Sequence, residues 1–250
     1  MLKYKLLVLL SIFLYTGANA QELGFGCLGL VGGYGGYQYQ KYKATGLNAY
    51  IDDFNTVAKD SLTGRFNQFG TLKGYRLGIN FYRQNFKGLV FTLKGFYSSV
   101  SEKRVASYNS LGGNKNYSLE VKSNNPGVGF DLGWAFGSVF HWKVVDAGIS
   151  YGDIRITKSY SMVNGIESDE EYDVKKIHVG YSVGTGFVLY VIEKYVSLEG
   201  TFGINNFSVD HFKNTSDVLL SYPSSNAPVN NAIESGGYSA TIQLNIGFPL

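Results

Sequence analysis

The sequence predicts an all-β fold, an antiparallel up-and-down transmembrane β-barrel of eight strands. Three observations predict it. Apolar residues alternate with small or polar residues in one segment after another, and a period of two is that of a strand with two unlike faces. The connections between these segments are alternately short and long. The composition is rich in Tyr, Phe and Gly, and only 16% of the residues are charged, where a soluble domain has about 25%.

Residues 1–20 have the three parts of a secretory signal peptide. These are a basic start with Lys3 and Lys5, an apolar run, and an Ala-Asn-Ala end. The apolar run is about half the length that a helix needs to span a bilayer. We therefore expect cleavage after Ala20, which leaves 21–250 as a single barrel domain.

Eight segments after the signal peptide carry the alternation. They lie at 23–39, 72–82, 89–99, 127–137, 142–152, 175–187, 196–205 and 237–250. In the last of them Tyr238, Ile242 and Phe248 belong to an apolar set, and the other set is small or polar. In the first, glycine is so frequent that the phase of the alternation is unclear.

The lengths of the connections predict which ends of the strands lie together. Short links are expected at 83–88, 138–141 and 191–194, and long loops at 40–70, 102–117, 157–172 and 208–236. This alternation places every long loop at one end of an antiparallel series and both chain ends at the other, as in transmembrane barrels. The stretch DVLLSY at 217–222 could extend the barrel wall or form an extra strand pair, which would give ten strands.

The polar face of the strands predicts which side meets lipid. It consists mostly of Gly, Ser, Thr and Asn, whereas the outer face of a soluble barrel would carry Lys and Glu. Small side chains suit the narrow interior of an eight-stranded barrel. Tyr238 and Phe248 lie ten residues apart on the apolar face, which is roughly 25 Å along the axis of a tilted strand and matches the apolar band of such barrels. The apolar face is therefore expected to point outward and the lumen to be filled by side chains.

The signal peptide, the eight alternating segments and the C-terminal GYSATIQLNIGFPL together resemble the small outer-membrane β-barrel proteins of Gram-negative bacteria. The abundance of Tyr, Asn and Gly is most similar to those of the Bacteroidota. The resemblance implies an outer-membrane location after export, contact with outer-membrane lipid and lipopolysaccharide, insertion by the outer-membrane assembly machinery, and a surface protein or glycan as a further partner. The chain departs from the family at its end, where Pro249 and Leu250 follow Phe248.

Seven ionisable residues are predicted to face the lumen. They are Arg76, Lys94, Asp131, Asp146, Lys176, His178 and Glu199. Their charges are balanced in sign, and unpaired charge in the lumen would be costly, so they are expected to pair as a polar plug. The alternative is a proton path or a ligand site.

The first long loop contains apolar residues at helical spacing. They are Leu47, Tyr50, Ile51, Phe54 and Val57. The spacing predicts a short amphipathic helix whose apolar stripe packs over the barrel mouth as a lid. The alternatives are a docking site for a partner or a helix at the membrane surface.

Composition and motifs argue against several classes of function. Without Lys3 and Lys5 the chain has 20 basic residues against 19 acidic ones, so no nucleic-acid partner is expected. Some barrels of this family resemble serine hydrolases and modify lipid A, with a histidine and a serine two residues apart. None of the histidines (His141, His178 and His211) has that serine or metal-ligand spacing, and no cofactor motif fits.

We therefore expect a non-enzymatic barrel with a structural or interaction role. A narrow conduit for small or hydrophobic solutes is the alternative, and a lipid-modifying enzyme is the third hypothesis.

Overall fold

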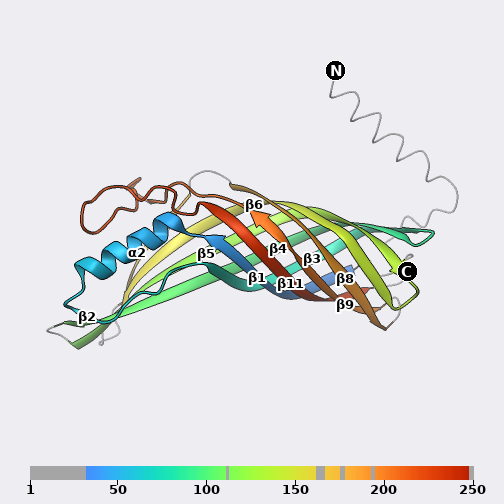
Figure 1. Ribbon diagram of the computed structural model, residues 1–250, viewed down its shortest axis with the longest axis horizontal. Coiled ribbons are helices and arrows are strands. Elements are labelled where there is room, and N and C mark those ends of the chain that lie inside the picture. Colours follow the sequence, from blue (N-terminus) through green and yellow to red (C-terminus); the bar gives the residue numbers. More distant parts are fainter. Residues whose placement is uncertain (1–31, 111–112, 162–166, 175–177, 193–194, 248–250) are drawn as a thin grey trace, which may run out of the picture.

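Eight antiparallel strands form a closed barrel in the computed structural model, which describes residues 32–110, 113–161, 167–174, 178–192 and 195–247 (Figure 1). The barrel strands are β1 (Gly32–Lys43), β3 (Thr71–Phe86), β4 (Leu89–Ser110), β5 (Gly113–Phe136), β6 (Phe140–Ser161), β8 (His178–Ile192), β9 (Val196–Asn206) and β11 (Ser235–Gly247). Each strand pairs with its neighbour along the series, and β1 pairs with β11 to close the ring. The predicted eight-stranded barrel is confirmed, and the ten-stranded alternative is wrong. The expected signal peptide at 1–20 lies outside the described residues.

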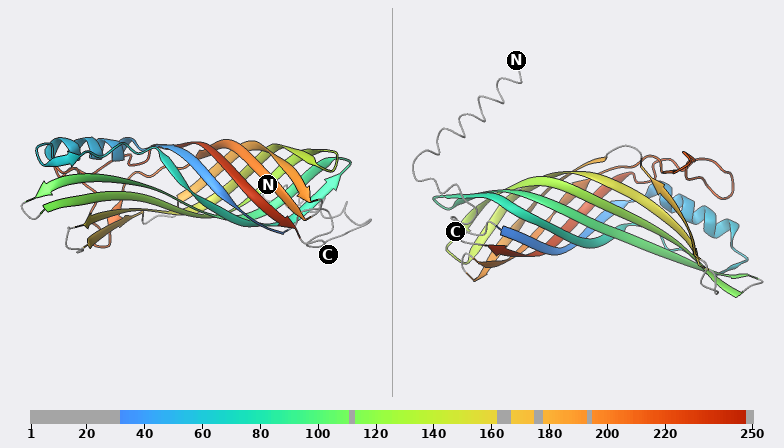
Figure 2. Two further views of the ribbon diagram at one scale, coloured as in Figure 1. Left: turned by 90° about the horizontal axis from the view of Figure 1, so that it is seen from below. Right: turned by 180° about the vertical axis from the view of Figure 1, so that it is seen from behind.

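The remaining elements gather at one end of the barrel. They are α2 (Thr45–Val57), β2 (Leu62–Gly64), β7 (Glu167–Asp173) and β10 (Lys213–Asn214). β2 pairs with β4, β7 with β6 and β10 with β7, all outside the closed ring. Figure 2 shows α2 beside the long hairpins, at the end opposite the short turns. No helix in the described part of the chain is long and apolar enough to cross a membrane.

The short turns lie at the other end, beside the paired ends of β1 and β11. Gly32 lies opposite Gly247 there. Lys87 and Gly88 join β3 to β4 with φ angles of 50° and 93°, and two successive positive φ angles are those of a type I′ hairpin turn. The arrangement matches the predicted asymmetry of short turns and long connections.

Within two of the predicted long loops, the described residues form strands instead. β4 and β5 remain paired to Ser110 and Gly113, and β6 continues to Ser161, where it pairs with β7. The predictions of loops at 102–117 and 157–172 are therefore wrong. The hairpins extend the wall of the barrel well beyond the closed ring (Figure 1).

The faces of these strands exchange their polarity where the hairpins leave the ring. On β5, Val128 and Phe130 point outward and are 52% and 41% exposed, whereas Leu119 and Val121 point inward and are fully buried. An outer face in lipid favours apolar side chains, and an outer face in water favours polar ones, so the apolar set moves to the inner face above the membrane. This exchange explains why the extensions were not predicted. The prediction assumed that the same face of each strand is apolar along its whole length.

The outer face of the closed ring is an apolar band. On β3 the side chains of Tyr75, Leu77, Ile79 and Phe81 are 42% to 51% exposed. On β11 the outward apolar residues run from Tyr238 to Ile246, about 27 Å along the strand and about 20 Å along the barrel axis. So large an exposed apolar surface is that of a protein surrounded by lipid.

The apolar side chains that point inward from the hairpins form a hydrophobic core, which we term the mouth core. It contains Tyr42, Ala44, Leu47, Tyr50, Ile51, Phe66, Phe69, Leu72, Val100, Ala106, Tyr117, Leu119, Val121, Ile154, Ile156, Tyr172, Val209, Phe212, Leu220, Val229, Ala232 and Ile233. Helix α2 and the segment 207–234 supply one side of it, and the extended strands supply the other. The end of the barrel that carries the long connections is therefore a folded unit.

Candidate functional site

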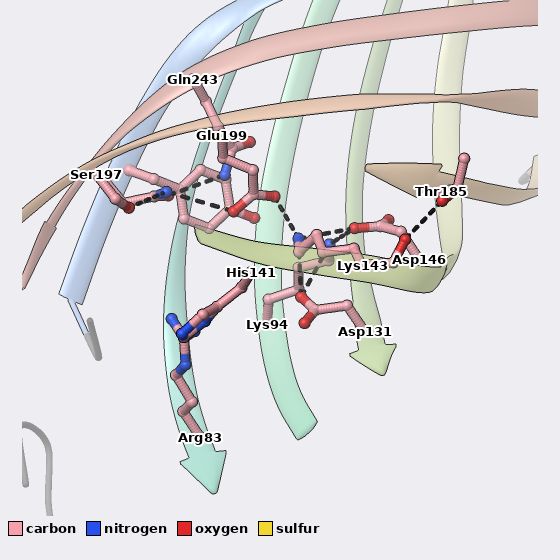
Figure 3. Close-up of polar contacts among 12 residues, drawn as sticks. Arg83, Lys94, Asp131, His141, Lys143, Asp146, Thr185, Ser197, Glu199 and Gln243 are labelled. Carbon is pink, nitrogen blue, oxygen red and sulfur yellow. Dashed lines mark hydrogen bonds and ion pairs between the residues drawn. The ribbon is translucent and has the colours of Figure 1, made fainter. Parts of the chain in front are cut away.

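Five charged side chains meet inside the closed ring. They are Lys94 on β4, Asp131 on β5, Lys143 and Asp146 on β6, and Glu199 on β9 (Figure 3). All five are between 3% and 8% exposed. We term this group the lumen cluster.

The two lysines hold the three carboxylates. Lys143 Nζ lies 2.9 Å from Asp131 Oδ2 and 3.0 Å from Asp146 Oδ2, and it also bonds Glu199 Oε1. Lys94 Nζ bonds Asp146 Oδ2 and lies 3.6 Å from Asp131 Oδ2. Asp131 and Asp146 are directly opposite each other on neighbouring strands, so without the lysines these two carboxylates would repel each other.

A β-bulge explains how Lys143 joins this group. The β6–β8 register shifts between Lys143 and Asp146, so Val144 and Val145 both leave the lumen face and the residues on either side of them point inward. A strict period of two assigns Lys143 to the outer face. The sequence prediction therefore missed the residue with the most ion pairs in the lumen cluster, and the adjacent pair of valines was the available signal.

The structure brings together four of the seven residues predicted to face the lumen: Lys94, Asp131, Asp146 and Glu199. Arg76 and His178 line a cavity above the cluster, which Asp146 also lines, and Lys176 lies outside the described residues. The guanidinium carbon of Arg76 lies 3.9 Å from the centre of the Phe96 ring.

A neutral hydrogen-bond network continues the lumen cluster toward β11. Asn245 Nδ2 donates to Ser197 Oγ at 3.1 Å and to Glu199 Oε2 at 3.3 Å, and Gln243 Nε2 donates to Asn245 Oδ1 at 3.0 Å (Figure 3). These amides were predicted as part of the polar face but not as partners of a charge.

A second polar group lies at the short-turn end of the lumen. Arg83 Nη2 donates to the hydroxyl of Tyr190 at 2.5 Å and to Nδ1 of His141 at 2.8 Å. A second bulge, between Asn80 and Tyr82, turns Arg83 inward. The sequence prediction missed this group for the same reason that it missed Lys143.

The apolar stripe of α2 faces the mouth core. Leu47, Tyr50 and Ile51 are buried, and Phe54 stacks on Tyr117 with ring centres 4.8 Å apart. Val57 is 58% exposed, so its place in the packed stripe was wrongly predicted. Val57 is the last residue of the helix, and no apolar surface of the described residues lies opposite it for its side chain to pack against.

Two titratable groups of the mouth core are shifted by burial. Burial raises the pKa of Tyr50 to about 12, and the Tyr50 hydroxyl lies 3.1 Å from that of Tyr117. Burial also lowers the pKa of Lys158, whose Nζ lies 4.5 Å from the ring centre of Tyr172 and 3.8 Å from Glu170 Oε2. The Tyr172 ring and the Glu170 carboxylate partly compensate for the burial of this lysine.

The three histidines lie apart from one another. His141 contacts Arg83 and Tyr190, and His211 lies 3.1 Å from Asp210 and 3.1 Å from the carbonyl oxygen of Val229. Among the described residues no group of His, Cys, Asp and Glu is arranged to hold a metal ion.

Solved structures of other proteins are similar to this chain in fold. No family model and no curated protein matches this sequence. The attachment invasion locus protein Ail of Yersinia pestis is 8% identical with a TM-score of 0.41, and the alignment covers 88% of this chain and 99% of that one. The Escherichia coli outer membrane protease OmpT is 12% identical with a TM-score of 0.41, covering 88% and 95% of the two chains. Neisserial surface protein A is 12% identical with a TM-score of 0.35, covering 88% and 99%.

Proposed function

We propose that this protein is an integral outer-membrane barrel with a closed lumen, which carries a folded platform at the cell surface for a structural or interaction role. The observation that carries the proposal is the exchange of polarity on β4, β5 and β6. A strand that is apolar outside and then apolar inside has left lipid and entered water while remaining folded. Export, cleavage after Ala20 and insertion by the assembly machinery belong to the same proposal.

The platform consists of the extended hairpins, α2 and the segment 207–234, joined by the mouth core. Because its apolar side chains are buried in that core, it presents a fixed surface rather than mobile loops. The outer faces of its strands are polar, with exposed residues such as Lys103, Lys122 and Asp153. Such a surface suits a protein or glycan partner outside the cell.

The lumen cluster closes the barrel to general diffusion. Its side chains come from β4, β5, β6 and β9, around much of the ring, and they are bonded to one another across the lumen. A narrow conduit remains the second candidate because a cavity of about 80 Å³ lies above the cluster. We propose no catalytic step.

A planar-bilayer recording separates the two candidates. We expect no single-channel current from the refolded protein, once heat-modifiable gel mobility has shown that the barrel is folded, because buried ion pairs fill the cross-section. A steady, salt-dependent conductance that changes with Glu199→Gln would contradict the closed lumen and favour the conduit.

Exposed lysines mark the edge of the apolar band on one side of the barrel. Lys73, Ser101, Lys122 and Arg155 lie opposite one another in a cross-strand row from β3 to β6, and Lys73 is the next outward residue beyond Tyr75. By contrast, β8, β9 and β11 contain no Lys or Arg. We assign Lys73 and Lys122 of this row to the phosphate groups of outer-leaflet lipopolysaccharide, whereas Arg155 is paired with Asp153 and Glu171.

We expect Lys73→Ser and Lys122→Ser each to weaken binding to lipid A vesicles about fivefold, since a surface cation near an anionic headgroup contributes about 1 kcal/mol. Co-sedimentation with vesicles of phosphorylated and dephosphorylated lipid A measures the effect. The control is Lys59→Ser, which removes an exposed lysine just after α2. Equal binding by all three variants would exclude the row as the lipid contact.

A further inference from the structure

A polar cavity of about 80 Å³ lies inside the barrel between the lumen cluster and the mouth core. Asp146 of the lumen cluster and Ile154 of the mouth core both line it. At roughly 10–15 Å³ for each water, it has room for about six water molecules. The site is therefore large enough for a small solute.

Arg76 is the cation of this cavity. Its guanidinium lies against the Phe96 ring, which covers one face of the plane and leaves the N–H edge free to donate. Its Nε atom is buried without a hydrogen-bond partner. No ion pair joins Arg76 to a described carboxylate. Asp146 lines the same cavity and its charge interacts with that of Arg76, but its carboxylate is bonded to Lys94 and Lys143.

Other donors line the same cavity. The hydroxyls of Ser150, Ser182 and Thr241 face it and form no side-chain hydrogen bond with the described residues. His178 also lines it, and its Nε2 atom is buried without a partner. Each hydroxyl can donate one hydrogen bond and rotate to suit its acceptor.

The charges inside the ring are unequal. Between the short turns and the mouth core, the described lumen-facing cations are Arg76, Arg83, Lys94 and Lys143, and the anions are Asp131, Asp146 and Glu199. His141 accepts from Arg83 through Nδ1 and so adds no charge there. One positive charge is therefore left over among the described lumen-facing residues.

We propose that this cavity binds one small monovalent anion, a halide or a short carboxylate, on the guanidinium edge of Arg76. A single charge matches the excess of one cation, and a guanidinium donates two parallel hydrogen bonds to a carboxylate or a forked pair to a halide. The hydroxyls of Ser150, Ser182 and Thr241 complete its coordination. The inference concerns the lumen and is independent of the role of the platform.

Thermal unfolding of the refolded barrel in detergent, at constant ionic strength, tests the site. The sodium salts compared are bromide, formate and gluconate, the last being much bulkier than the other two. We expect bromide, formate or both to raise the melting temperature saturably relative to gluconate, because a ligand that binds only the folded state stabilises it. A response to one salt alone identifies the anion as a halide or as a carboxylate. Crystals soaked in bromide should show an anomalous peak beside Arg76.

Three variants assign the effect to this residue. Arg76→Met should weaken the apparent affinity at least about tenfold, since a charge-assisted hydrogen bond is lost, whereas Arg76→Lys should weaken it less, because lysine keeps the charge and loses only the forked pair of donors. Lys59→Met, which removes an exposed cation just after α2, should leave the affinity unchanged. The proposal is overturned if all three salts act alike on the wild type, which would mean a hydrated lumen only, or if Arg76→Met retains the wild-type affinity.

Discussion

Lys143→Met should destabilise the barrel by about 3–5 kcal/mol, the cost of removing one partner from a buried ion pair. Lys143 contacts all three carboxylates of the lumen cluster, and methionine preserves much of its stem volume. Lys94 alone would then face Asp131, Asp146 and Glu199. Urea unfolding in lipid vesicles, followed by tryptophan fluorescence and by heat-modifiable gel mobility, measures the loss.

The charge explanation has its own controls. Lys122→Met removes a lysine from the exposed outer face of β5 and should change the free energy of unfolding by less than about 0.5 kcal/mol. Adding Glu199→Gln to Lys143→Met should restore part of the stability, because one uncompensated carboxylate is removed and the two positions are coupled. If Lys143→Met is as stable as Lys122→Met, the lumen cluster does not hold the barrel together.

Ile51→Asp should release α2 from the mouth core while the closed ring stays intact. Ile51 is fully buried, and an unpaired carboxylate there would cost several kcal/mol. The ring has its own strand pairing and its own lumen contacts, so it does not depend on the helix. We expect protease to cleave within 44–70 on intact cells expressing the variant, with unchanged heat-modifiable mobility of the uncleaved protein.

Val57→Asp is the matched control on the same helix. Its side chain is 58% exposed, so the same substitution should leave the loop as resistant to protease as in the wild type. Cleavage of both variants at the same rate would mean that α2 is not held by the mouth core, and the platform would then be a mobile loop.

The closed ring could be predicted from the sequence because one physical condition applies along its whole height. Lipid outside and a narrow lumen inside impose the same alternation from Tyr75 to Phe81 on β3 as from Tyr238 to Ile246 on β11. The short turns could be placed because they interrupt that alternation. The helix of the first loop was visible for a similar reason, since Leu47, Tyr50, Ile51 and Phe54 recur at the helical period.

The features that escaped prediction have three different physical causes. A bulge before Asp146 turns Lys143 inward, and another after Asn80 does the same for Arg83. The hairpin extensions keep a period of two, but Leu119 and Val121 are apolar on the face that is polar lower down on β5. The last position of the helical stripe, Val57, failed because a sequence period does not show where the opposing surface ends.

The pairing of β1 with β11 makes the order of folding events depend on the far end of the chain. These neighbours in space are separated by nearly the whole described sequence, so the contact that closes the ring has the greatest entropic cost of all its pairings. Until β11 arrives, β1 and β9 each leave a ladder of backbone donors and acceptors unpaired, which hydrocarbon does not tolerate. Stable insertion therefore requires a chain that is complete as far as β11, and a truncated chain has no inserted state in which its backbone is satisfied.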